Sequence, residues 1–351
     1  MKNLIKDSVR VISPYSPSKN NYNVRLDANE NPFNLVSELQ EEIAEIIRDM
    51  KMNRYPDTDC VRLKVGLSKY VGMKQENIIC GNGSDEIIQV IIQTFVDKGD
   101  AVVTHIPTFS MYSIFTKIAG GRIIEIPSKE DFKIDVEKLI EASIQNKAKL
   151  IFLCNPNNPT GATIPYCDII EVLKRTDAMV VVDEAYYEFF GETIASHVNE
   201  WDRLIVLRTL SKAFGLADIR LGYGIAGVST IEILNRVLPP YNLSSFSQAM
   251  GSLALRHADK VLSYIKTIKA EREYVLDKLQ EIKKINIYPS AGNFVLVTSE
   301  KLSEIADFCD KEGIGIRVFR NDPMLKNAMR ITIGSRLENE RMIETIRKVV
   351  G

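Results

Sequence analysis

The sequence predicts an α/β protein with a large domain, built on a mostly parallel sheet covered on both faces, and a smaller α+β domain. A chain of 351 residues is long enough for two domains, each with its own hydrophobic core. Between about residues 78 and 228, short β-branched apolar runs alternate with helical segments, and after Pro289 the pattern changes. We therefore expect an N-terminal segment at 1–30 associated with the small domain, the large domain at 31–255 and the small domain at 256–351.

The strands of the large domain are predicted from apolar runs of four to six residues that are bounded by polar or turn residues. Such runs are typical of strands buried on both faces. They lie at 101–104, 122–126, 150–153, 179–182, 204–207 and 223–226. Helical periodicity at 84–96 and 166–175 places helices between them. Because ligands of open α/β sheets bind beyond the carboxyl ends of the strands, the residues that follow these runs are the candidates for a site.

A second architecture follows the break at Pro239 and Pro240. A long helix is expected at about 258–283, with apolar positions at helical spacing. Three strand candidates then lie at 293–298, 314–319 and 329–333, with helices at about 300–312 and 337–349. These segments predict a small antiparallel sheet. The first 30 residues contain Pro14 and Pro17 and are expected to be irregular.

The composition limits the classes of partner. A net charge of −1 gives no electrostatic reason to expect nucleic acid or an anionic membrane. No run of 18 apolar residues exists, and residues 1–12 lack the apolar core of a signal peptide. Five scattered cysteines and three separated histidines argue for reduced thiols in the cytoplasm and against a disulfide framework or a metal site. The expected partners are small molecules and a second copy of the chain.

The first candidate motif is Gly81–Glu86, a glycine turn that leads into a helix with Ser84 as a good N-cap. Free amides at a helix N-terminus can bind an anion. A well-capped helix without a ligand explains the same residues. The sequence contains neither GxGxxG nor GxxxxGK[ST], so the dinucleotide fingerprint and the P-loop do not apply.

Two further motifs follow predicted strands directly. Asn155–Gly161 is a loop made rigid by two prolines, and it carries an asparagine that can donate to a ligand oxygen. Asp183–Tyr187 offers a carboxylate that can pair with a protonated ring nitrogen and a tyrosine that can bond a phenolic oxygen. The alternatives are a stiff turn for the first motif, and a helix cap with a core tyrosine for the second.

The fourth motif is Thr209–Leu216, which places Lys212 in a turn rich in small and hydroxyl residues after a buried strand. Desolvation there favours the neutral amine, which is the nucleophile that forms imines. Thr209, Ser211 and Arg220 supply hydroxyl and guanidinium donors suited to a phosphate. Taken in this order, the four motifs form a specific constellation.

These motifs resemble those of the aspartate-aminotransferase-like (fold type I) pyridoxal-phosphate enzymes, and within them the histidinol-phosphate aminotransferases. The likeness covers nearly the whole chain: LDANENP at 26–32, RYPD at 54–57, GNGSDE at 81–86, NPNNPTG at 155–161, DEAYYEF at 183–189, TLSKAFGLADIRLGY at 209–223 and MRITIG at 329–334. Two departures are Asp218 and Asn34, where the family commonly has glycine. Neither touches the chemistry that the resemblance implies.

The resemblance implies a site for pyridoxal 5'-phosphate, carried as a Schiff base on Lys212. Asp183 would pair with the pyridine nitrogen, and Asn158 and Tyr186 would contact the phenolic oxygen. Phe109 would stack on the ring. The phosphate would be held by Gly83, Ser84, Asp85, Thr209, Ser211 and Arg220. Tyr55 would reach the phosphate of the neighbouring subunit's cofactor, so the resemblance implies a homodimer with shared sites.

The implied reaction is amino transfer between L-histidinol phosphate and 2-oxoglutarate in histidine biosynthesis, with Lys212 moving the proton and with ping-pong kinetics. Arg330 and Arg317 would meet the substrate phosphate, and Tyr15 and Asn29 would help to close over the substrate. Arg317 could instead pair with a surface acid such as Glu312.

Several alternatives stay open from the sequence. Two are enzymes on the same cofactor, an aromatic aminotransferase and a threonine-phosphate decarboxylase, the second disfavoured by Glu30 in the NENP stretch. A cofactor-sensing gene regulator and a nicotinamide dehydrogenase are other classes, disfavoured by the missing DNA-binding module and the missing glycine fingerprint.

Overall fold

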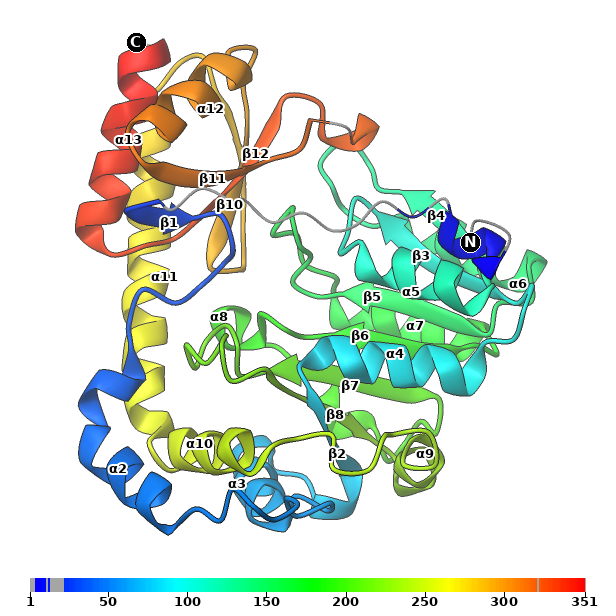
Figure 1. Cartoon of the computed structure of the whole chain (residues 1–351). Helices are drawn as coiled ribbons and strands as arrows, with labels where there is room; N and C mark the ends of the chain where they lie inside the picture. The colour runs from blue at the N-terminus through cyan, green and yellow to red at the C-terminus, as the bar shows by residue number, and fades with distance from the viewer. Residues whose placement is uncertain (1–3, 11, 13–21, 321, 351) are drawn as a thin grey trace.

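The computed structural model describes residues 4–10, 12, 22–320 and 322–350. Tyr15, which the sequence placed near the substrate, lies outside the described residues. The chain forms two separate sheets, of seven and five strands, joined along one side by a long helix (Figure 1). The predicted α/β class with a second, smaller sheet is confirmed, whereas the exact domain boundaries stay a prediction.

The seven-stranded sheet has the order β2-β8-β7-β6-β5-β3-β4. Its strands are β2 (Ile78–Asn82), β3 (Ala101–Ile106), β4 (Arg122–Pro127), β5 (Leu150–Cys154), β6 (Met179–Asp183), β7 (Leu204–Thr209) and β8 (Leu221–Ala226). All pairings are parallel except those of β8, which is antiparallel to both β2 and β7. The six predicted strands are confirmed. β2 was not predicted from the sequence, because Gly81 and Asn82 shorten its apolar run.

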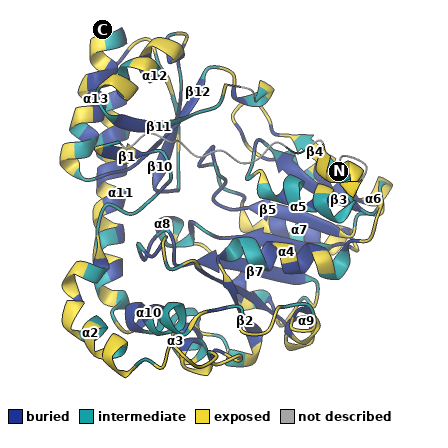
Figure 2. Cartoon of the chain, viewed as in Figure 1, coloured by how far each residue is buried: buried dark blue, intermediate teal, exposed yellow. Residues whose placement is uncertain are grey.

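Helices cover both faces of this sheet, as the uniformly apolar strands require. They are α3 (Val61–Val71), α4 (Ser84–Phe95), α5 (Met111–Ala119), α6 (Val136–Gln145), α7 (Tyr166–Arg175), α8 (Tyr187–Phe190), α9 (Val228–Leu234) and α10 (Ser245–Arg256). Alternate residues of β5 belong to different cores: Phe152 packs with α4 and α5, and Leu153 packs with α6 and α7. Figure 2 shows the strands as the buried centre between exposed helix faces.

The five-stranded sheet has the order β1-β11-β12-β10-β9. Its strands are β1 (Val24–Leu26), β9 (Asn286–Tyr288), β10 (Phe294–Thr298), β11 (Ile314–Val318) and β12 (Ala328–Thr332). The pairings are antiparallel, as predicted, except that β1 joins β11 in parallel. The prediction that the first 30 residues are irregular is therefore wrong for the helix α1 (Asp7–Arg10) and for the strand at Val24–Leu26. Three residues are too few to show a period of two, and their partner strand lies near the other end of the chain.

The remaining helices connect and cover the two sheets. They are α1 (Asp7–Arg10), α2 (Gln40–Asp49), α11 (Ala258–Gln280), α12 (Leu302–Lys311) and α13 (Arg336–Val350). In Figure 1, α11 runs from α10, beside the large sheet, to the small sheet, where it packs with α13. Within the described residues, none of the helices combines the length and the apolarity needed to cross a membrane.

Candidate active site

The four motifs meet at one edge of the large sheet. β2, β5, β6 and β7 run in the same direction, so their carboxyl ends lie at the same edge. Because β8 runs the opposite way, its first residues also lie at this edge, which brings Arg220 beside the turn that carries Lys212. Lys212, just after β7, and Arg220, just before β8, therefore reach the same site.

A pocket of about 180 Å³ opens at this edge, between the large sheet and the small sheet. The predicted residues that line it are Asn29, Ser84, Asp85, Phe109, Asn158, Asp183, Tyr186, Thr209, Ser211, Lys212, Arg220 and Arg330. Ala28, Cys154 and Ala185 also line it and were not singled out from the sequence. The cavity therefore brings together residues that lie more than 300 positions apart along the chain, such as Ala28 and Arg330.

Asp183 is the last residue of β6 and is 3% exposed. Its Oδ2 accepts a hydrogen bond from the Tyr112 hydroxyl at 2.7 Å, and its Oδ1 accepts from the Ala185 amide at 3.1 Å. Burial raises the pKa of Asp183 to about 6, and the bond from Tyr112 opposes this rise. Within residues 22–320 and 322–350, no ion pair reaches this carboxylate. A cation entering the pocket would stabilise its charged form.

Lys212 reaches the same pocket from the turn after β7, and its Nζ donates to the Ala28 carbonyl oxygen at 3.1 Å. Burial lowers the pKa of the Lys212 amine to about 8, and the charge of Arg330 lowers it further. At neutral pH this amine is therefore neutral in a far larger fraction of molecules than an ordinary lysine, whose pKa is near 10.4. Such an amine can act as a nucleophile or as a base.

The first turn of α4 and the start of β8 form a corner of the pocket whose donors suit an anion. Gly83, with a φ of 78°, precedes Ser84, whose amide is among those that a helix leaves without an internal partner. A Cβ on Gly222 would lie 2.1 Å from the Ser84 nitrogen, so only glycine lets the helix end pack this closely against β8.

Arg220 and Ser211 complete this corner. Arg220 has a left-handed φ of 52°, and its guanidinium lies 3.5 Å from the Ser211 hydroxyl and 3.3 Å from an Asp85 carboxylate oxygen. The Ser211 amide donates to the Thr209 hydroxyl at 3.0 Å, which holds the turn in place. Amides, hydroxyls and a guanidinium converging on one point are the donors that a phosphate accepts.

Tyr186 lies at the end of α8 that faces the pocket and is 3% exposed. Its hydroxyl oxygen accepts from Asn29 Nδ2 at 2.9 Å. Burial raises the pKa of Tyr186, and the charge of Arg330 opposes the rise. Tyr186 is therefore a protonated donor at neutral pH.

Arg330 on β12 fixes the amide of Asn158. Its Nη1 donates to Asn158 Oδ1 at 2.5 Å, and its Nη2 donates to the Asp27 carbonyl oxygen at 2.6 Å. The Asn158 carbonyl therefore points to Arg330, which leaves the amide nitrogen for other partners. The special partners that the sequence predicted for a buried strand arginine are present.

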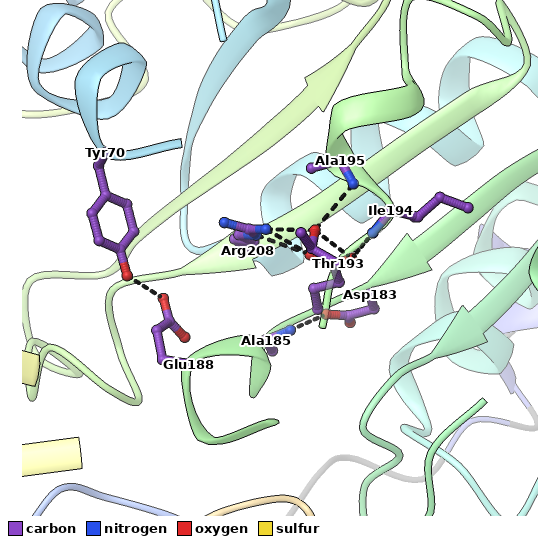
Figure 3. A network of polar contacts seen from close by, with 9 residues as sticks. Tyr70, Asp183, Ala185, Glu188, Thr193, Ile194, Ala195 and Arg208 are labelled. Carbon is purple, nitrogen blue, oxygen red and sulfur yellow. Dashed lines mark hydrogen bonds and ion pairs between the residues drawn. The ribbon is translucent and has the colours of Figure 1, made fainter. Parts of the chain in front are cut away.

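A buried polar network supports the strand ends behind Asp183 (Figure 3). Glu184 and Arg208 form an ion pair at 2.9 Å, with 2% and 3% of their side chains exposed. Thr193 donates to both Glu184 oxygens, and the Ile194 amide donates to one of them. The Arg208 guanidinium also stacks on the Tyr187 ring. This network fixes the chain on both sides of Tyr186.

Three predicted residues lie outside the 180 Å³ pocket. Gly83 adjoins Arg220 without lining the cavity. Tyr55 is 80% exposed and stacks on Tyr241. Arg317 lines a neighbouring cavity of about 670 Å³, which shares Phe109 with the first. Tyr55 is therefore turned to the surface of its own chain.

Two features of the site were missed from the sequence: the bond of Tyr112 to Asp183 and the Arg208–Glu184 pair. Tyr112 follows the Pro107–Phe109 stretch on a helix whose apolar face indicates only core packing. Arg208 inside a predicted buried strand was a signal that could have been used, because a buried arginine needs a partner.

A family model described as Aminotransferase class I and II matches residues 23–346. The histidinol-phosphate aminotransferase of Clostridium novyi (strain NT) is 40% identical, over 99% of this chain and 97% of the relative. That of Pyrococcus furiosus is 39% identical, over 98% of each chain.

Solved structures give the same result. A histidinol-phosphate aminotransferase from Clostridium acetobutylicum has a TM-score of 0.85 at 26% identity, over 93% of this chain and 98% of that one. A histidinol-phosphate aminotransferase from Sinorhizobium meliloti, in complex with pyridoxal-5'-phosphate, has a TM-score of 0.89 at 24% identity, over 99% of this chain and 97% of that one. At this identity the likeness shows that the two proteins share a fold. The chain belongs to the aminotransferase class I and II family.

Proposed function

We propose that this chain is a histidinol-phosphate aminotransferase, which transfers an amino group reversibly between L-histidinol phosphate and 2-oxoglutarate with pyridoxal 5'-phosphate as cofactor. The relatives that carry this name match essentially the full length at about 40% identity. The structural observation that carries the proposal is one pocket that joins a buried carboxylate, an amine of lowered pKa and an anion-binding corner. The reaction would serve L-histidine biosynthesis.

The residues present fit this cofactor. Asp183 offers a buried carboxylate to a protonated ring nitrogen, and such a cation would offset the cost of burying the charge. The close packing at Gly222 and the donors of Ser84, Ser211 and Arg220 suit a phosphate. The partly buried ring of Phe109 lines the same pocket and can cover the face of a ring.

When bound, pyridoxal 5'-phosphate supplies a ring that accepts the electron pair released at the substrate's Cα. Asp183 would hold the proton on the ring nitrogen. Tyr186 would donate from its hydroxyl to the phenolic oxygen, and Asn158 would donate from the amide nitrogen that Arg330 leaves available. Each of these groups is oriented by a second bond before any ligand enters.

Lys212 would attach the cofactor and then move the proton. With the amino donor bound, the free Lys212 amine would be the base that removes the proton from the substrate's Cα. The same amine then returns the proton as an acid. Its lowered pKa suits both tasks near neutral pH. Two half-reactions in one site predict ping-pong kinetics.

Two arginines of the small sheet would recognise the substrate phosphate. Arg317 and Arg330 lie directly opposite each other on β11 and β12, so their side chains leave the same face of the sheet. Guanidinium groups suit a doubly charged phosphate because their geometry is bidentate. Phe109 borders the cavities of both arginines, so a ligand spanning them would pass this ring.

The enzyme would act as a homodimer in the cytoplasm. Tyr55, exposed on its own chain, would reach the cofactor phosphate of the other subunit. Exposed aromatic rings such as Tyr55 and Tyr241 are enriched at interfaces between proteins.

A substrate comparison tests the proposed function. The purified protein, saturated with cofactor, is assayed with L-histidinol phosphate and 2-oxoglutarate beside phosphothreonine and phenylalanine. We expect the highest kcat/KM with histidinol phosphate, and parallel double-reciprocal plots. Faster release of carbon dioxide from phosphothreonine, or a higher kcat/KM with phenylalanine, would replace the proposal with one of these activities.

Borohydride reduction tests the role of Lys212. Reduction of the holoenzyme followed by peptide mapping is expected to give one stable adduct, at position 212. The Lys212→Ala variant should lose the adduct and the visible absorbance. Lys149→Ala is the matched control, because this exposed lysine precedes β5 at the opposite end of the sheet, and it should keep both. An adduct elsewhere contradicts the mechanism.

A further inference from the structure

Tyr112 is a fully buried tyrosine of α5 whose hydroxyl contacts the Asp183 carboxylate. Its side chain is 0% exposed, and its hydroxyl donates to Asp183 Oδ2 at 2.7 Å. Its ring stacks on Phe152 with a centroid distance of 4.6 Å and an angle of 7°, and it meets Phe109 edge-on at 5.6 Å. Two ring contacts leave the hydroxyl little freedom to leave the carboxylate.

The bonds around Asp183 determine which form of its carboxyl group is favoured. Within residues 22–320 and 322–350, Tyr112 supplies the one side-chain hydrogen bond to this carboxylate, and Ala185 supplies a backbone bond. Cys154, Asp85, Glu184 and Tyr186 also interact with it and carry no positive charge, and the cations Lys212, Arg220 and Arg330 line the same pocket. The hydroxyl of Tyr112 is the side-chain hydrogen-bond donor that favours the ionised form against burial.

Burial also keeps Tyr112 in its role as a donor. Desolvation and the neighbouring carboxylate raise the pKa of its phenol, so the hydroxyl stays protonated. The bond therefore has one direction, from Tyr112 to Asp183. The remaining lone pairs of the carboxylate are available to the pocket, which Asp183 lines and Tyr112 does not.

We propose that Tyr112 is a positioning residue, which keeps Asp183 ionised and oriented so that the shared proton rests on the cofactor's ring nitrogen. This inference rests on the proposed function, in which Asp183 pairs with that nitrogen. Tyr112 lies in the first turn of α5, directly after Phe109. The start of this helix would therefore position both Phe109, which covers the face of the cofactor ring, and Asp183, which pairs with the ring nitrogen. Loss of the hydroxyl would let the proton move to Asp183.

The test uses holoenzyme prepared with pyridoxal 5'-phosphate labelled with ¹⁵N in the ring. In Tyr112→Phe, the pKa of the ring nitrogen, read from its ¹⁵N chemical shift against pH, should fall by about one unit, roughly a tenfold loss of proton affinity. We expect kcat to fall with it, while the KM for the amino donor changes little. The native protein, titrated over the same pH range, gives the reference pKa.

Tyr70→Phe is the matched control. It removes a partly buried phenol that also donates to an acid, Glu188 at 3.3 Å, outside the pocket. This variant should leave the ¹⁵N shift unchanged. An unchanged shift in Tyr112→Phe as well would overturn the inference while leaving the proposed function intact.

A second variant covers the case in which Tyr112→Phe does not fold. Incorporation of 3-fluorotyrosine at position 112 keeps the ring and makes the hydroxyl a stronger donor. The pKa of the ring nitrogen should then rise, and an unchanged or lowered pKa would overturn the inference. A native protein that binds no cofactor would overturn both this inference and the proposed function.

Discussion

Asn29 donates from Nδ2 to the Tyr186 hydroxyl oxygen at 2.9 Å, and this bond links the small sheet to the large one. Thr332 on β12 accepts from the Asn29 amide and donates to Asn29 Oδ1, at 2.9 and 3.2 Å. Asn293 donates to the Asn29 carbonyl oxygen. The orientation of the Asn29 amide is thus fixed, and the Tyr186 oxygen must accept from it. The proton of Tyr186 is left to donate into the pocket.

Asn29→Asp should reverse this arrangement. Aspartate tolerates the φ of 54° found here, but its carboxylate would draw the Tyr186 proton away from the pocket. We expect kcat to fall about 10-fold, in line with the loss of a charge-assisted hydrogen bond, and the visible absorbance of the bound cofactor to shift. Steady-state kinetics and titration of the absorbance would measure both.

Asn77→Asp is the control for this change, because Asn77 is a buried asparagine bonded to the far end of β8. Its cofactor spectrum should equal that of the native protein. If Asn29→Asp retained native kcat and absorbance, the role given to the Asn29–Tyr186 bond would be wrong.

The lowered pKa of Lys212 predicts a distinct pH profile in the cofactor-free protein. Only the neutral amine reacts, so labelling of Lys212 by acetic anhydride should rise with pH and be half-maximal near pH 8. An unperturbed lysine titrates near pH 10.4. Arg330→Met removes one charge that lowers the pKa, and the midpoint should move upward. A midpoint near 10 in the native protein would refute the desolvation that the structure indicates.

The buried Arg208–Glu184 pair predicts a large effect on stability. Arg208→Met leaves the Glu184 carboxylate buried without its cation, and the free energy of unfolding should fall by about 3 kcal/mol. Urea denaturation of the cofactor-free protein measures this. Arg175→Met breaks the exposed pair with Glu137 and should cost at most about 1 kcal/mol. Equal losses in the two variants would argue against a special role for burial.

Subunit complementation tests whether Tyr55 acts across a dimer. Lys212→Ala and Tyr55→Ala homodimers should each have low activity, for different reasons. A mixed dimer contains one site with both Lys212 and the partner's Tyr55 intact, so mixing should restore up to about half of the native activity per mixed dimer. Activity that stays at the average of the two variants would show that Tyr55 does not serve the other subunit.

The predicted strands of the large sheet and the order of the four motifs needed no tertiary information. A strand buried on both faces is apolar at consecutive positions, and this run is visible in the sequence itself, as at Leu150–Cys154. Chemistry placed at strand ends then follows from the general geometry of parallel sheets. Lys212 and Asp183 were found in this way.

Tertiary structure decided which of these residues meet, and how each is held. Three contacts have no signature in the local sequence. They are the antiparallel pairing of β8, the pairing of Val24 with Ile314 and the bond of Tyr112 to Asp183. Sequence periodicity records the backbone conformation and burial of one segment, whereas each of these contacts joins segments that come together only when the sheets pack. The candidate residues that line the pocket could thus be named from the sequence, and the partners that set their charge and orientation could not.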